Sequence, residues 1–125
     1  MKSENPYASL ERIFHEPNRL AIMSALCNTA HGLTFNELKE TCQLTDGNLN
    51  RHLKTLEDAK AIRIEKTFER SRPKTTIYLS DSGRDHFLEY LKALEEVLRK
   101  AAVALAPGTA HPSIRSSIFG KTARA

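Results

Sequence analysis

The stretch 44–77 constrains the fold most, because a helical repeat of apolar residues gives way there to a strand-like repeat. Leu49, Leu53 and Leu56 recur at i, i+4 and i+7, which places them on one narrow stripe of a helix. Isoleucine then alternates with charged residues, as in a half-buried strand, and a second β-rich run covers residues 75–79. The stretch predicts a helix over residues 45–59 followed by a two-stranded hairpin.

The face of this helix opposite the leucines is polar, as counted at about 100° per residue. Side chains of its kind can hydrogen-bond to base edges and to phosphates. The face and its flanks hold Gly47, Asn48, Asn50, Arg51, Lys54, Thr55 and Asp58. Thr45 or Asp46 can cap the helix. Gly47 is a poor helix former, by about 1 kcal/mol relative to alanine, but it would let a phosphate approach the helix N-terminus; the alternative is a simple turn residue.

The expected tip of the hairpin, residues 69–74, carries three cations and one acid. The cations are Arg70, Arg72 and Lys74, and the acid is Glu69. Alone, such a run is a solvated turn. Directly after the polar helix it favours contact with phosphates or with a narrow minor groove, where arginine is preferred.

Three shorter helices are expected before residue 45. Apolar spacing predicts the first over residues 7–15, and the second starts at Pro17 and ends near residues 28–32, where Gly32 supplies a stop. Thr34 and Glu37 have the spacing of a capping box, which opens a third helix over residues 35–41.

A last long helix is expected from residue 81 to about residue 106, with Ser80 as its N-cap and Pro107 and Gly108 as its stop. Six apolar residues repeat along it with the alternating spacing of a coiled-coil seam: Phe87, Leu91, Leu94, Leu98, Ala101 and Leu105. The helix would be roughly 37 Å long, which a small domain cannot cover. The stripe either packs on its own domain or, as we favour, pairs two chains as a homodimer.

Composition limits the class of protein. With 125 residues, of which 40% are hydrophobic, the chain can bury one core. The net charge of +4, from 19 basic and 15 acidic side chains, permits binding to a polyanion without identifying one. Two cysteines build neither a disulfide framework nor a four-cysteine zinc site, and no signal peptide or membrane span is evident, so a cytoplasmic protein is expected. Residues 107–125 are expected to be a flexible basic tail.

The combined pattern resembles the winged helix-turn-helix transcriptional regulators of the MarR and ArsR type. The resemblance lies in Leu-Thr-Asp-Gly-Asn-Leu-Asn-Arg-His-Leu-Lys-Thr-Leu-Glu at residues 44–57 and Leu-Ser-Asp-Ser-Gly-Arg at residues 79–84. It implies an α+β, mainly α fold, with a DNA-binding domain over 7–80 and a dimerisation helix over 81–106. It further implies a dimer that binds double-stranded DNA, with residues 45–59 in the major groove and the wing, residues 69–75, at the minor groove. The function expected from this is that of a repressor that occupies an inverted repeat. On the resemblance, the DNA-binding residues are Thr45, Gly47, Asn48, Asn50, Arg51, Lys54, Thr55, Arg70, Arg72 and Lys74.

Departures from that family restrict other functions. Cys42 lacks the paired cysteine of metal sensors, so no metal or cofactor is expected. Redox sensing through Cys27 or Cys42 has weak support, because Cys27 is expected on an apolar face. His52 is read as a packing histidine and His86 as a surface or interface one. An unidentified small-molecule effector could bind between the long helix and the DNA-binding core, in a pocket lined by Phe14, Phe87 and Tyr90. The alternative is that these three residues belong to the core or to the dimer interface.

The sequence also bears on two other classes of function. A protein-interaction module without DNA binding is the alternative, since fold does not fix function. No enzyme is expected, because the sequence has no phosphate loop and no nucleophile beside a base.

Overall fold

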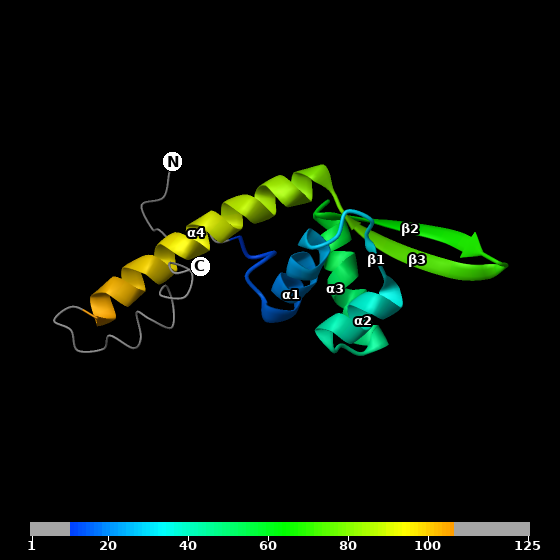
Figure 1. The fold of residues 1–125 in the computed structure, drawn as a ribbon, viewed down its shortest axis with the longest axis horizontal. Coiled ribbons are helices and arrows are strands. Elements are labelled where there is room, and N and C mark those ends of the chain that lie inside the picture. The colour runs from blue at the N-terminus through cyan, green and yellow to red at the C-terminus, as the bar shows by residue number, and fades with distance from the viewer. Residues whose placement is uncertain (1–10, 107–125) are drawn as a thin grey trace. The chain divides into compact units, whose positions relative to one another are not determined.

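The computed structural model describes residues 11–106, which form four helices and three strands. In chain order these are α1 (Pro17–Cys27), β1 (Leu33–Thr34), α2 (Phe35–Cys42), α3 (Asp46–Asp58), β2 (Ile62–Glu69), β3 (Arg72–Leu79) and α4 (Asp81–Leu105), as Figure 1 shows. Of the described residues, those up to Tyr90 form one compact unit, and the later residues of α4 belong to a second. The expected α+β, mainly α architecture is confirmed.

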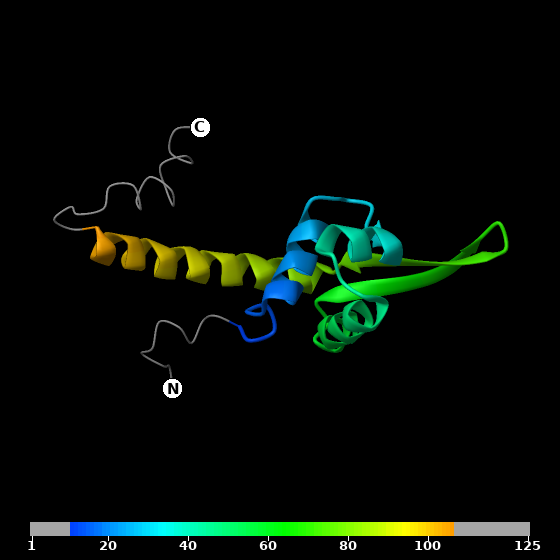
Figure 2. The ribbon, with the colours of Figure 1, turned by 90° about the horizontal axis from the view of Figure 1, so that it is seen from below.

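The sheet is antiparallel with strand order β1-β3-β2. β2 and β3 pair over their whole length, from Ile62 opposite Leu79 to Glu69 opposite Arg72, and extend beyond α1, α2 and α3 (Figures 1 and 2). Only Arg70 and Ser71 join them, both at positive φ, the backbone of a tight primed hairpin turn. The six-residue tip expected from the sequence was therefore too long, because strand pairing continues through four of its residues.

β1 is a strand that the sequence did not predict. Leu33 and Thr34 pair with Ile77 and Thr76, which makes the sheet three-stranded instead of two-stranded. Gly32, just before it, has φ +79°, and a Cβ there would lie 2.7 Å from the Ile77 carbonyl oxygen. The glycine therefore permits close approach to β3, while α1 already ends at Cys27 with Asn28 as its cap.

The helix starts follow local signals. Both hydrogen bonds of the capping box at α2 are present: the Thr34 hydroxyl accepts from the Glu37 N–H at 3.1 Å, and Glu37 accepts from the Thr34 N–H at 2.9 Å. Thr45, and not Asp46, caps α3. Ser80 Oγ accepts from the Gly83 N–H at 2.8 Å at the start of α4.

The core of the compact unit joins the helices to the sheet. Its fully buried aliphatic side chains come from every helix except α4 and from β3: Ile22, Met23, Leu26, Leu38, Leu49, Leu56 and Ile77. α4 contributes Phe87 and Tyr90, which pack with Phe14 at ring-centroid distances of 5.2 to 5.9 Å. All three rings are at most 2% exposed, so they belong to the core of the compact unit.

Two local expectations need correction. Residues 11–15 form a turn closed by the Phe14 N–H on the Glu11 carbonyl, so the described part of the expected 7–15 helix is not helical, and its start lies outside the described residues. Cys27 is exposed instead of lying on the apolar face of α1. The stop at Pro107 and Gly108 and the basic tail also lie outside the described residues.

Candidate nucleic-acid interface

The predicted polar face of α3 is fully formed and open to solvent. Leu49, Leu53 and Leu56 anchor the helix in the core, as the stripe predicted. The opposite side chains are exposed, except for the half-buried Thr55: Thr45, Gly47, Asn48, Asn50, Arg51 and Lys54. Gly47 has no atom within 4 Å of a Cβ built on it, so the N-terminus of α3 is open to a ligand.

The two longest side chains on this face each contact a neighbour on the same helix. Arg51 Nη2 donates to Asn48 Oδ1 at 2.7 Å, and Lys54 lies 3.6 Å from the Asp58 carboxylate. Both contacts are exposed and weak against solvent, so either cation can be redirected to an anion at little cost. Thr55 instead donates its hydroxyl to the Arg51 carbonyl at 3.1 Å, which turns this group toward its own helix.

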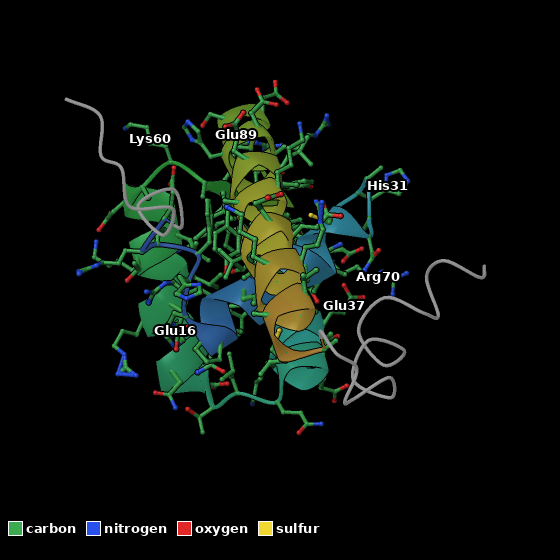
Figure 3. All side chains as sticks on the ribbon, turned by 90° about the vertical axis from the view of Figure 1, so that its left-hand side faces the viewer. Glu16, His31, Glu37, Lys60, Arg70 and Glu89 are labelled. Atoms are coloured by element: carbon green, nitrogen blue, oxygen red, sulfur yellow. The ribbon has the colours of Figure 1, made fainter. Side chains whose placement is uncertain are left out.

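A buried polar contact connects the inner side of α3 to the start of α1. His52 is 8% exposed, and its Nδ1 lies 3.4 Å from Arg19 Nη1 and 3.9 Å from Glu16 Oε1. Glu16, labelled in Figure 3, also caps α1 by accepting from the Arg19 N–H at 2.8 Å. His52 is thus the packing histidine that the sequence predicted, and its contacts tie α3 to the start of α1.

The three wing cations lie near one another, but their surroundings differ. A hollow between the start of α2 and the distal wing is lined by Arg70, Arg72 and Lys74 together with Phe35 and Glu69. Lys74 lies 3.3 Å from the Glu69 carboxylate, which partly neutralises it. Arg70 occupies the turn itself and is labelled in Figure 3.

A second hollow between α3 and the wing was missed by sequence reasoning. It is lined by Asn50, Leu53, Lys54 and Glu57 of α3, by Phe35 of α2, and by Ile64, Lys66 and Thr75 of the β2–β3 hairpin. The alternation at residues 62–68 was a usable signal, because residues two apart share a face of a strand. It places Lys66, a residue outside the predicted set, beside α3.

The two thiols offer no activated nucleophile. Although Cys27 is exposed as a residue, partial desolvation of its thiol raises its pKa, with the nearby Arg84 acting in the opposite direction. Partial burial alone raises the pKa of Cys42. Neither is therefore primed for redox chemistry at neutral pH. Across residues 11–106, no cluster of three metal-ligating side chains is present and no helix could cross a membrane.

The seam residues of α4 fall into two groups. Phe87 is buried against Phe14 within the chain, so it serves the core and has no surface left for a partner. Leu91, Leu98 and Leu105 remain 38%, 45% and 59% exposed, and Ala101 is exposed while Leu94 is half-buried. The exposed leucines keep the apolar stripe open from Leu91 onward.

Comparison with known proteins identifies this arrangement. A family model described as a winged helix DNA-binding domain matches residues 18–98, more than half of the chain. A relative, an uncharacterized protein of Methanocaldococcus jannaschii, is 38% identical over 80 residues, which cover 64% of this chain and 86% of the relative.

Solved structures agree with the family. A transcriptional regulator homologue from Pyrococcus horikoshii OT3 has a TM-score of 0.67 at 27% identity, covering 73% of this chain and 89% of the other. S. aureus MepR, solved as a DNA complex, shares the fold with a TM-score of 0.61 at 21% identity, covering 78% of this chain and 79% of the other. The resemblance to winged-helix regulators, which are not enzymes, is confirmed. The chain belongs to the winged helix DNA-binding domain family.

Proposed function

We propose that this protein is a homodimeric transcriptional repressor that binds an inverted repeat in double-stranded DNA. In this proposal α3 enters the major groove and the wing contacts the adjacent minor groove. The observation that carries it is the exposed polar face of α3, which is held on a buried leucine stripe and adjoins a cationic wing. The family supports DNA binding, and the DNA-bound MepR supports it by likeness of fold.

The roles of the polar side chains follow from their chemistry. Arg51 and Asn48 can reach base edges, because guanidinium and amide groups make paired hydrogen bonds to guanine and adenine. Thr45, Gly47, Asn50, Lys54 and Thr55 surround them and are assigned to backbone positioning. Arg70, Arg72 and Lys74 are assigned to phosphates or the minor groove, with Lys74 the least available because of Glu69.

Dimerisation is proposed through the open stripe of α4, from Leu91 to Leu105. Two copies of α3 would then read two half-sites related by the same twofold axis.

The test is selection of binding sites from a random duplex pool at about 0.15 M salt, which screens weak nonspecific attraction. We expect enrichment of an inverted repeat with half-sites about one helical turn apart. Absence of any enrichment by a folded dimer, with tight binding to a protein instead, would favour an interaction module. Transcription from a promoter that carries the selected repeat should fall when the protein is added, whereas a rise would assign activation.

Base readout by Arg51 gives a sharper prediction. Arg51→Ala should cost about 1–3 kcal/mol at one base position and relax the preference there. Arg72→Ala is the matched control, because loss of a phosphate contact weakens all sequences alike and flattens the salt dependence. Equal losses on selected and random duplex for both variants would remove Arg51 from base readout.

A further inference from the structure

Phe68 is the most exposed of the large apolar side chains in residues 11–106. It lies on β2 near the wing turn and is 76% exposed. Pro73 is directly opposite it on β3 and is also exposed. The pair forms a small apolar surface outside the core.

Strand register determines which way the pair faces. Ile64 is opposite Ile77, Lys66 is opposite Thr75, and Phe68 is opposite Pro73. Directly paired residues share a face of the ribbon, as do residues two apart along a strand. Ile64, Lys66 and Thr75 line the hollow beside α3, so by register Phe68 continues that same face toward the turn. Pro73 starts from the same face of the ribbon and, like Thr75, also borders the hollow at the start of α2.

The predicted wing cations lie mainly on the other face. Arg72 is opposite Glu69 and Lys74 is opposite Thr67, so their side chains start from the face away from the hollow. The acids Glu65 and Glu69 share that face, where they pair with Arg63 at 3.1 Å and Lys74 at 3.3 Å.

The face beside α3 therefore combines a cationic rim with an apolar end. Lys54 and Lys66 line its hollow, with Glu57 as the acid among the lining residues, and Arg70 lies in the adjacent turn. This charge is complementary to DNA backbone, which would be drawn against the same face that presents Phe68.

We propose that Phe68 is a DNA contact: its ring enters the minor groove beside the duplex held by α3 and packs against deoxyribose and base edges. Phenylalanine and proline are among the apolar side chains that minor-groove proteins insert. The inference rests on the proposed function and assigns to the wing an apolar contact in addition to its cations.

The test compares Phe68→Ala with wild type on the duplex recovered by selection. Removing the ring should weaken binding about tenfold, as expected for losing roughly half of the burial of a phenylalanine side chain. The slope of log affinity against log salt should not change, because no phosphate contact is lost, whereas Arg70→Ala should lower it by about one. Phe68→Leu should retain most of the affinity.

Thr67→Ala is the matched control, since Thr67 is the next residue on β2 and lies on the opposite face. It should bind within about twofold of wild type, a difference of only a few tenths of a kcal/mol. Thermal unfolding should be unchanged in Phe68→Ala because the side chain is so exposed.

Four results would overturn the inference. Wild-type affinity in Phe68→Ala, or an equal loss in Thr67→Ala, removes Phe68 from the interface while leaving the proposed function intact. A changed oligomeric state of free Phe68→Ala with unchanged DNA binding makes the face a contact between copies of the chain. Failure of the wild-type protein to bind any duplex overturns the proposed function and the inference together.

Discussion

The free space around the backbone differs sharply between two glycines of this protein. A Cβ on Gly83 would collide with the carbonyl of Ala61, which is backbone and cannot swing away. A Cβ on Gly47 would meet nothing within 4 Å. Both residues lie in the first turn of a helix, so intrinsic helix propensity alone would treat them alike.

We therefore expect opposite effects of the same substitution at the two sites. Gly83→Ala should lower the free energy of unfolding by about 1–3 kcal/mol, because it overpacks the junction between α4 and the residue before β2. Gly47→Ala should raise it by up to about 1 kcal/mol, because alanine is the better helix former. Urea denaturation measures both, and destabilisation of similar size at both sites would show that packing at Gly83 is not the cause.

At the scale of an element, α2 depends on its first turn. The helix has eight residues, and its capping box satisfies N–H groups that would otherwise lack partners. Thr34 is also the last residue of β1, where it pairs with Thr76 of β3. The same residue therefore ends a strand and caps a helix.

Thr34→Ala should cost about 1 kcal/mol of folding stability through loss of the hydroxyl acceptor. Thr34→Ser is the matched control, since serine keeps the hydroxyl and loses only the methyl group. Chemical denaturation should place the serine variant much closer to wild type. If the two variants are equally destabilised, the effect belongs to the strand and not to the cap.

At the scale of the whole molecule, the proposed dimer depends on which residues of α4 form its interface. Leu98 lies on the apolar stripe, whereas Val103 is 63% exposed and lies well away from that stripe, at about 100° per residue. A buried aspartate in a dimer interface would be unpaired and costly.

Leu98→Asp should therefore convert the protein from a dimer of 14.1 kDa chains to a monomer and lower its affinity for the inverted repeat. Val103→Asp adds the same charge off the stripe and should remain dimeric. Sedimentation equilibrium distinguishes them. A wild-type protein that sediments as a monomer, or two variants that behave alike, would rule out dimerisation through this stripe.

Local patterns in the sequence were sufficient for most of the elements and for the exposed polar face of α3. The capping pair Thr34 and Glu37, the stripe of Leu49, Leu53 and Leu56, and the cap at Ser80 each act within one or two helical turns. Periodicity and caps are short-range properties, so they can be read directly from neighbouring residues.

Features that depend on contacts between distant segments could not be read from local patterns. β1 is two residues long, too short for a pattern, and exists because Leu33 meets Ile77 more than forty positions later. The exposure of Cys27 and the orientation of Phe68 toward the α3 side of the wing likewise depend on packing and strand register. A one-residue change of register would turn Phe68 to the opposite face, which is why the chain alone could not reveal its position.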